Sequence, residues 1–594
     1  MVVGGCVEKS RQEPSCGRVL RECSVQQFAI VATHAISQPE QEAGAASAVI
    51  QLIDAQGTEL MPLVQVYGND LPRVMNELEA HSPRWVFDSI HNWYPQVLAA
   101  GHTINRAHDL SLTDNLLRNA PFAVPGDYLT ALRSQPDPTT LAPAHLLPPP
   151  RVAENQGELF SEPKDDSGAL ENLMTRFLAQ RSAVGTDERG KRLGLLIAAE
   201  SSGALIGAEM TAAGVPWDVA VHERLLLETL GPRVAAGIRP PRMEFLATQI
   251  REILRAPSLN PDSPQELLRA MNQAGITISN TRAWELAEIK HPVIEPLLAY
   301  KKIARLASAN GFGWLERWVI HGRFRPEYVV GGVITGRWAS HGGGALQIPH
   351  QVRSAVRADP GKVLVVADAA QLEPRVLAAL SRDTALASAA RGKDLYQGIA
   401  DAGFGGDRAH AKIAMLGAMY GATTGESGRL MPKLKSTYPR AVGLVEWAAQ
   451  HGEAGSSVAS FLGRGSGAAS TEWMNAQKRA DSEEAARRAQ SEARSRGRFT
   501  RNFIVQSTAA EWALCWMGEL RKRLRLGSTQ GTDLGQLVFF LHDEIMLHVP
   551  AEQAEHVVEL VHESARAAAQ LLFGTIPVDF PVSAAIVDSY DQAK

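Results

Sequence analysis

Residues 362–380, KVLVVADAAQLEPRVLAAL, constrain the fold more than any other stretch of the chain. Their valine-rich start is typical of a buried strand that ends at Asp368, and from Leu372 the apolar residues follow a helical period. The strand therefore holds a carboxylate on a rigid support. An Asp at a strand end is more often a turn or cap residue. However, a buried, unpaired carboxylate is costly, so a metal ion or a basic partner is expected beside it.

A second carboxylate follows 175 positions later, in residues 536–550, QLVFFLHDEIMLHVP. Two apolar runs flank His542, Asp543 and Glu544 and leave room only for a tight turn, so the pattern predicts a β-hairpin with Asp543 at its tip. If Asp368 and Asp543 lay side by side in one sheet, they could hold two divalent ions about 4 Å apart. That arrangement serves in-line phosphoryl or nucleotidyl transfer.

Three motifs, in this order, resemble those of the family A DNA polymerases, the class of bacterial DNA polymerase I. DAAQLEPR is similar to motif A, DRAHAKIAMLGAMYG (residues 407–421) to motif B and LHDE to motif C. LNPDSPQELL, HPVIEPLLAYKKIARLAS and VITGRWAS resemble the thumb and template-contacting segments, so the resemblance runs from about Glu200 to the C-terminus. The chain looks like the Klenow-type members without a 5′-nuclease domain, such as the actinobacterial bifunctional 3′–5′ exonuclease/DNA polymerase proteins.

The resemblance implies an α/β multidomain (α+β) chain: a right-hand polymerase of palm, fingers and thumb with an N-terminal ribonuclease H-like α/β exonuclease-type domain. Residues 1–26 lack periodicity and are expected to form a loose extension, and residues 136–167, rich in proline and acids, to form a linker. The domains are then expected at 27–135 (exonuclease-like) and 168–594 (polymerase), with the thumb at about 240–310, the palm at about 320–390 and 500–594, and the fingers at about 391–499.

The exonuclease-like domain lacks the acids of a proofreading site. The family places Asp-x-Glu on the first strand to bind two metals, whereas this strand reads AIVATHAIS, with Thr33 and His34 in its second half. Asp88 and Asp109 remain, and scattered acids of this kind are usually surface or capping residues. We therefore expect an exonuclease-like fold without proofreading chemistry; residual exonuclease activity is the alternative.

Motif B predicts a helix whose residues at steps of four form one stripe: Arg408, Lys412, Leu416 and Tyr420. Two cations at its N-terminal half suit a triphosphate, since Arg binds phosphate oxygens with two donors and Lys acts as a point charge. Tyr420 can pack against the forming base pair. A solvated basic face is the alternative. Leu416 stands where the family carries Phe or Tyr against the sugar.

Residues 487–501, RRAQSEARSRGRFTR, carry six arginines and lead into a segment that resembles the family's Gln helix. Its residues Arg498, Asn502 and Gln506 share one helix face and match positions that touch the nucleotide, the template and the minor groove. Residues 323–337 predict strand, glycine turn and strand ending at Arg337, which matches a family arginine near the primer terminus. The segment ASHGGGALQIPHQ departs from the family because it has three glycines and lacks an Asn.

The resemblance thus implies three sets of site residues. The metal and catalytic residues are Asp368, Asp543, Ala369 (metal) and Lys412 (catalytic). The nucleotide-binding residues are Arg408, Lys412, Leu416, Tyr420, Gln371, His542 and Glu373, the last matching the carboxylate that blocks a ribose 2′-hydroxyl. The DNA-binding residues are Arg337, Gln347, Arg498, Asn502, Gln506 and Glu544.

Composition limits the remaining choices. The net charge of −4 does not by itself indicate a polyanion partner, so a nucleic-acid surface must be a local concentration of Arg and Lys. Four cysteines without metal-ligand spacing fit a reducing cytosol, and no apolar run approaches the roughly 18 residues of a membrane span. We expect a cytoplasmic (nucleoid) monomer that binds no membrane.

The sequence therefore predicts a template-directed DNA polymerase that extends a primer 3′-hydroxyl with dNTPs on primer–template DNA, using two Mg²⁺ ions for which Mn²⁺ may substitute. Three alternatives stay open. A single-subunit RNA polymerase shares the palm but not Glu373 or the HDE triplet. A proofreading or repair nuclease needs an N-terminal carboxylate cluster. A weakly catalytic or non-catalytic DNA-binding repair factor of the same fold would tolerate loss of Asp368 or Asp543.

Overall fold

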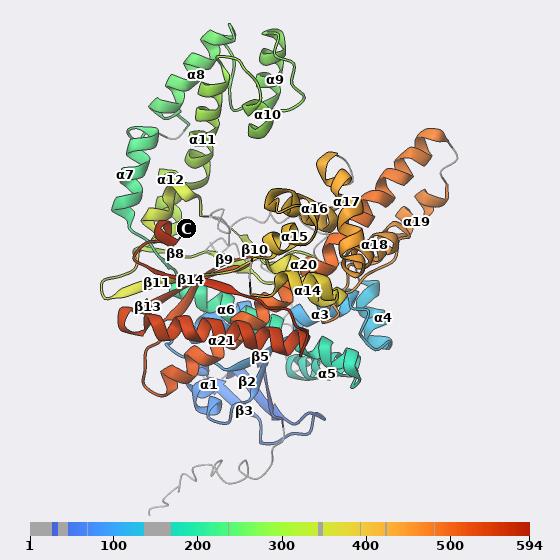
Figure 1. Ribbon diagram of the computed structural model, residues 1–594. Coiled ribbons are helices and arrows are strands. Elements are labelled where there is room, and N and C mark those ends of the chain that lie inside the picture. The colour runs from blue at the N-terminus through green and yellow to red at the C-terminus, as the bar shows by residue number, and fades with distance from the viewer. Residues whose placement is uncertain are drawn as a thin grey trace, which may run out of the picture. The chain divides into compact units, whose positions relative to one another are not determined.

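The computed structural model describes residues 26–33, 46–67, 69–135, 168–235, 237–341, 348–392, 394–421, 425–479 and 482–593 (Figure 1). The loose extension, except residue 26, and the linker expected at 136–167 lie outside these residues. The chain forms two compact units, one of residues 1–111 with 159–181 and one of residues 112–158 with 182–594. This division differs from the sequence-based boundaries, because residues after 111 group with the second unit.

The first unit is built on a five-stranded sheet of order β3-β2-β1-β4-β5. Its strands are β1 (Phe28–Thr33), β2 (Ala46–Ile53), β3 (Val64–Tyr67), β4 (Arg84–Phe87) and β5 (Arg106–Asp109). The β1–β2 and β2–β3 pairs are antiparallel, whereas the β1–β4 and β4–β5 pairs are parallel. The helices α1 (Leu71–Glu79) and α2 (Ile90–Ala99) form the crossovers to β4 and β5.

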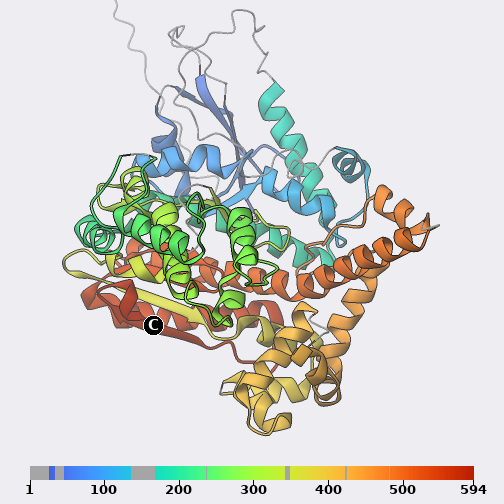
Figure 2. The same cartoon turned by 90° about the horizontal axis from the view of Figure 1, so that it is seen from above.

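The second unit contains a four-stranded sheet of order β12-β13-β11-β14. Its strands are β11 (Lys362–Ala369), β12 (Gln536–Leu541), β13 (Glu544–Pro550) and β14 (Val582–Val587). Long helices accompany it: α6 (Glu188–Ala213), α21 (Ala554–Phe573) and the 47-residue α20 (Glu483–Thr529), orange in Figure 2.

The remaining elements of the second unit are mostly helices. Along the chain, α6 is followed by α7 (Val219–Leu230), α8 (Pro241–Ile253), α9 (Pro264–Gln273), α10 (Ala283–Ala287), α11 (Ile294–Asn310) and α12 (Phe312–Trp318). After β11 come α13 (Leu372–Ser381), α14 (Thr384–Ala390), α15 (Leu395–Gly403), α16 (Arg408–Tyr420), α17 (Gly425–Thr437), α18 (Pro439–Glu453) and α19 (Thr471–Lys478). The shorter elements are β6 (Val215–Pro216), β7 (Val319–Ile320), β8 (Arg323–Phe324), β9 (Glu327–Val329), β10 (Ala339–His341), η3 (His350–Ala355), η4 (Ala551–Gln553) and η5 (Tyr590–Ala593). The helices α3 (Leu110–Asn119), α4 (Asp127–Ser134) and α5 (Ala169–Ala183) lie near the boundary between the units in sequence.

The strand β11 is buried on both faces. Val365 and Ala367 enter a core that contains residues of α20 and α21, and Leu364 and Val366 enter a second core with residues of α7 to α12. Successive side chains of a strand point to opposite faces, so Asp368 lies on the same face as Leu364 and Val366. The apolar run that predicted this strand is therefore explained by burial on two sides.

Among the described residues, α6 is long and apolar enough to cross a membrane by length and composition alone. The sequence analysis expected no such segment. However, 61% of its apolar window is buried inside the protein, and Leu196, Leu205 and Met210 are completely buried. We therefore describe α6 as a core helix.

The strand–turn–strand pattern predicted for residues 323–337 is only partly present. The chain forms β8 and β9, and it then runs irregularly until β10 begins at Ala339. Gly331 and Gly336 have φ of 61° and 81°, in the left-handed region that favours glycine and interrupts a strand. Arg337 thus lies in a connection between two strands. The prediction that it ends a strand is wrong.

Candidate active site

The two candidate metal-binding aspartates lie at the same end of the four-stranded sheet. Asp368 is the penultimate residue of β11 and stands opposite Glu544 of β13 in the antiparallel register. Asp543 belongs to the turn between β12 and β13, and its carbonyl oxygen accepts a hydrogen bond of 2.9 Å from the Ala369 N–H. The turn also contains His542, with φ of 58°. One backbone hydrogen bond therefore joins motif A directly to motif C.

The charge of Asp368 disfavours the ionised form of Asp543. Burial, followed by this charge, raises the pKa of Asp543 to about 6. A divalent cation between them would remove this repulsion. Among the described residues, no group of three or more His, Cys, Asp and Glu side chains is arranged to hold a metal. Two carboxylates nevertheless fit Mg²⁺, which usually takes one or two carboxylates and completes its shell with water and substrate phosphates.

Glu544 is buried rather than available to DNA. Its side chain is only 3% exposed, and it accepts a hydrogen bond from the Tyr590 hydroxyl. Burial, followed by this hydrogen bond, raises the pKa of Tyr590. The predicted DNA contact of Glu544 is therefore wrong for this arrangement, because its carboxylate points into the protein and is bonded there. Sequence could not show this, since Glu544 and Tyr590 are 46 positions apart.

Glu373 links three segments of the second unit. It lies in the first turn of α13, and its carboxylate accepts hydrogen bonds from Arg337 and, at 2.6 Å, from the Tyr420 hydroxyl. Tyr420 is the last residue of α16. Burial raises the pKa of Tyr420, and the bond to Glu373 adds to the shift. Three of the predicted site residues, Arg337, Glu373 and Tyr420, are thus in one hydrogen-bonded cluster.

The helix α16 begins and ends where capping rules place its termini. The Asp407 carboxylate accepts the His410 N–H at 3.0 Å, and Gly421 ends the helix with φ of 74°. The buried face contains Ala411, Ala414, Met415 and Ala418. Arg408, Lys412 and Tyr420 are exposed, and Leu416 is partly buried against the core. The predicted stripe therefore lies on the outward face of the helix.

Arg408 and Gln371 converge on Asp394, a residue that the sequence analysis missed. The Arg408 guanidinium donates to the Asp394 carboxylate from Nε at 3.2 Å and from Nη2 at 2.9 Å. The Gln371 side-chain amide donates to the same carboxylate at 2.6 Å. The only signal in the sequence was an Asp directly before the apolar run of residues 395–400, which is typical of a helix N-cap.

The remaining DNA-binding and nucleotide-binding candidates are placed as follows. On α20, Arg498 is exposed and Asn502 and Gln506 are partly buried, whereas the neighbouring Phe503 and Ile504 are in the core. Their shared face is therefore the accessible one. Burial, followed by the charge of Arg337, lowers the pKa of His542. Gln347 lies outside the described residues.

Arg375 is a second residue that the sequence analysis missed. It is 1% exposed and donates to three carbonyl oxygens: Ala370 at 3.0 Å, Ala390 at 2.7 Å and Asp579 at 3.0 Å. These bonds tie the turn after β11 to two distant segments. The signal in the sequence was an arginine among the apolar residues of α13. A buried guanidinium needs hydrogen-bond acceptors around it, so this arginine indicated a bonded, structural role.

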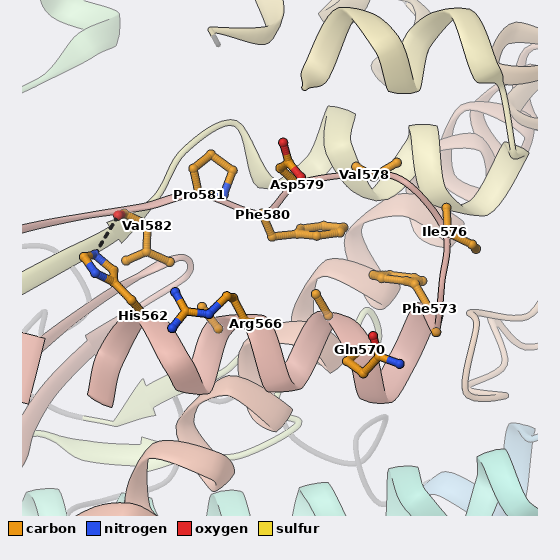
Figure 3. Close-up of a pocket in the computed structure, with 13 residues that line it drawn as sticks. His562, Arg566, Gln570, Phe573, Ile576, Val578, Asp579, Phe580, Pro581 and Val582 are labelled. Atoms are coloured by element: carbon orange, nitrogen blue, oxygen red, sulfur yellow. Dashed lines mark hydrogen bonds between the residues drawn. The ribbon is translucent and has the colours of Figure 1, made fainter. Parts of the chain in front are cut away.

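A cavity of about 500 Å³ lies between α21 and residues 574–582 (Figure 3). Figure 3 shows His562, Arg566 and Gln570 of α21 on one side and Asp579, Phe580 and Pro581 on the other. Asp579 accepts the Gly392 N–H at 3.0 Å and is the one carboxylate of the lining. This cavity lacks the paired acids that two-metal transfer requires.

The acids of the first unit have structural partners. Asp88 forms an ion pair of 2.6 Å with Arg176, and Asp109, 2% exposed, accepts the Ile90 N–H at 2.7 Å. Thr33 ends β1, and His34 lies outside the described residues. Neither acid belongs to a candidate metal cluster of the described residues.

Known proteins share both the fold and the sequence pattern. The polymerase domain of Pol1 from M. smegmatis, solved in complex with DNA primer-template and dNTP, matches with a TM-score of 0.65 over 96% of each chain at 18% identity. This likeness shows the right-hand polymerase fold. The family model described as DNA polymerase family A matches residues 241–592, more than half of the chain. The chain belongs to DNA polymerase family A.

Two curated relatives give the degree of similarity. The thermostable DNA polymerase I of Thermus filiformis is 28% identical over 495 residues, which are 75% of this chain and 54% of the relative. That of Thermus aquaticus is 26% identical over 515 residues, which are 80% of this chain and 56% of the relative. The chain spans about half the length of the curated relatives it matches.

Proposed function

We propose that the protein is a DNA-directed DNA polymerase that extends a primer 3′-hydroxyl with dNTPs by nucleotidyl transfer, in DNA replication or repair. The observation that carries the proposal is the meeting of Asp368 and Asp543 at one sheet end, joined by the Ala369–Asp543 hydrogen bond. Family membership supports it, as do relatives named DNA polymerase I and a structural neighbour solved with primer-template and dNTP.

In the proposed mechanism, Asp368, Asp543 and Ala369 would hold two Mg²⁺ ions, for which Mn²⁺ would substitute. Bound cations of this kind lower the pKa of an attacking hydroxyl and offset the charge of the leaving pyrophosphate. Arg408 and Lys412 bind the triphosphate from the exposed face of α16. Because Lys412 carries no carboxylate partner among the described ion pairs, its ammonium is available for phosphate.

Glu373 is the proposed sugar selector. Arg337 and Tyr420 hold its carboxylate in place, so it would obstruct a 2′-hydroxyl with little freedom to move aside. Tyr420 and Leu416 would pack against the nucleotide. The accessible face of α20, with Arg498, Asn502 and Gln506, would follow the minor groove, whose acceptors vary little with sequence.

We assign the thumb to about 240–310, the palm to about 320–390 and 500–594 and the fingers to about 391–499. The first unit is proposed to be exonuclease-like without proofreading activity, since Asp88 and Asp109 are bonded to Arg176 and Ile90. We propose a monomer in the cytoplasm, at the nucleoid.

Primer extension tests the proposal. With Mg²⁺ and all four dNTPs, the wild type should extend a labelled primer–template, and Asp368→Asn and Asp543→Asn should each lose at least about a thousandfold in rate while primer–template affinity stays within a factor of about three. The matched control is Asp533→Asn, because Asp533 is exposed at the other end of the sheet, 3.9 Å from Lys362. Ordinary turnover in either active-site variant would contradict the metal assignment.

A further inference from the structure

Asp394 connects the two sequence motifs that carry the proposed nucleotide site. Its partner Gln371 follows β11 by two residues, and its partner Arg408 opens α16. The Gln371 side-chain oxygen in turn accepts the Leu395 N–H at 3.0 Å and an Arg375 N–H at 3.3 Å. A single carboxylate thus ties the end of the metal-binding strand to the start of the phosphate-binding helix.

The geometry leaves Arg408 able to bind phosphate. A guanidinium has five N–H donors. Asp394 accepts one hydrogen bond from Nε and one from Nη2, so three N–H groups remain, two on Nη1 and one on Nη2. The guanidinium also lies 5.6 Å from the centre of the Tyr396 ring. The carboxylate therefore fixes one edge of the guanidinium and leaves Nη1 available. The contact orients the guanidinium and does not compete with phosphate for all of its donors.

Asp394 is ionised, as the orientation of Arg408 requires. Burial opposes ionisation, but hydrogen bonds from Arg408, the Gln397 N–H and Gln371 outweigh it and hold the pKa of Asp394 below its usual value. The hydrogen bonds between Arg408 and Asp394 also raise the pKa of Arg408. Both groups remain charged at neutral pH, so the contact is a charge-assisted pair with two hydrogen bonds.

Helix capping alone does not explain these contacts. Asp394 caps α15 by accepting the Gln397 N–H at 2.8 Å, which takes one acceptor site of a carboxylate that has about four. Asp383 caps α14 in the same way. Within the described part of the chain, it otherwise accepts only the backbone N–H groups of Arg440 and Ala441, at 3.1 Å. Asp394 differs because its other acceptors take two side chains of the proposed site.

We propose that Asp394 is a positioning residue of the nucleotide site: it orients Arg408 toward the triphosphate and couples that arginine to the strand end that carries Asp368. The proposal rests on the proposed polymerase function, since Arg408 is assigned to phosphate only there. Asp394 itself touches neither the nucleotide nor the metal ions. Its loss should weaken nucleotide binding without changing the chemical step.

The test is a double-mutant cycle in which the affinity for dNTP is measured. The variants Asp394→Asn, Arg408→Ala and the double variant are bound to a primer–template whose primer ends in a dideoxynucleotide, and the Kd of the next dNTP is measured in each. Asparagine keeps an oxygen for the cap, but its amide nitrogen cannot accept from Arg408 or Gln371. Asp394→Asn should raise Kd about five- to tenfold in the wild-type background and less than about twofold in Arg408→Ala.

The matched control is Asp383→Asn, which removes a capping carboxylate of the same kind and should leave Kd within about twofold. Thermal unfolding of all variants separates loss of folding from loss of binding. An Asp394→Asn effect that is equal in both Arg408 backgrounds, or a lowered Kd, overturns the proposal. In parallel, wild type is given a primer with a free 3′-hydroxyl. Binding without extension would refute the polymerase function, and the cycle would still decide the role of Asp394.

Discussion

At the scale of single residues, the site depends on carboxylates that are each held by two other side chains. Glu373 is held by Arg337 and Tyr420, and Asp394 by Arg408 and Gln371. A carboxylate with two donors is fixed in direction more firmly than one with a single donor, since rotation about its terminal bond would break one of the contacts. Selection at such a site can therefore be steric.

This rigidity predicts the effect of Glu373→Ala. The change removes the proposed obstruction to a 2′-hydroxyl, so the ratio of kcat/KM for dNTP over the matching rNTP should fall at least about tenfold. Single-nucleotide incorporation with each substrate measures the ratio. The control is Glu563→Ala on α21, whose carboxylate is half exposed and 3.7 Å from Arg523. An unchanged ratio in Glu373→Ala would show that another residue selects the sugar.

At the scale of elements, the two sheets use their acids differently. In the second unit, Asp368 and Asp543 meet at one end of the sheet, and the pKa of Asp543 is raised. In the first unit, Asp88 follows β4 and is paired with Arg176, and Asp109 ends β5 and is bonded to Ile90. A carboxylate that is bonded to an arginine or to a backbone N–H is less available to bind a metal ion together with a second acid.

This contrast predicts that the first unit does not proofread. The wild type should not degrade a 3′-mismatched primer with Mg²⁺ or Mn²⁺ when nucleotides are absent, as judged by gel analysis of a labelled primer. Asp88→Asn and Asp109→Asn should leave extension unchanged. Metal-dependent degradation that disappears in Asp88→Asn or Asp109→Asn, but persists in Asp368→Asn, would prove that these acids form a second active site.

At the scale of the whole molecule, several ionisable side chains are buried away from the site. His222 is completely buried, and its ring nitrogens contact the Trp217 N–H at 3.2 Å and the Asn310 carbonyl at 3.0 Å. Burial lowers the pKa of His222 from 6.5 to about 4. Burial raises the pKa of Glu511, also completely buried, to about 7. The two groups affect stability in opposite directions as pH falls.

The histidine contribution is isolated by comparing wild type with His222→Gln. The folded state keeps His222 neutral down to about pH 4, whereas the unfolded chain takes up a proton below pH 6.5. Its contribution to stability is therefore complete above pH 6.5 and declines as pH falls toward 4. The advantage of wild type in unfolding free energy, measured by urea denaturation, should shrink by about 2 kcal/mol between pH 7.5 and 5. An equal advantage at both values would contradict the burial of a neutral ring.

Local patterns were sufficient for the elements that carry the site. The apolar run before Asp368, the hairpin around Asp543 and the stripe of α16 all appear where the sequence predicts them, because strand and helix periods are set by neighbouring residues. The resemblance to motifs A, B and C also led to the family, which the comparisons confirm. Arg337 was misplaced at a strand end because Gly331 and Gly336 interrupt the pairing.

Tertiary structure alone decided which side chains meet. The sequence by itself determined that one acid lies at the end of an apolar strand, that a second lies in the turn of an apolar hairpin and that two cations share a helix face. These are properties of short segments. It did not determine that Glu544 is bonded to Tyr590, that Arg375 binds Asp579 or that Asp394 joins Gln371 to Arg408. These partners are separated by up to 204 positions, and only the packing of the whole unit brings them within hydrogen-bonding distance.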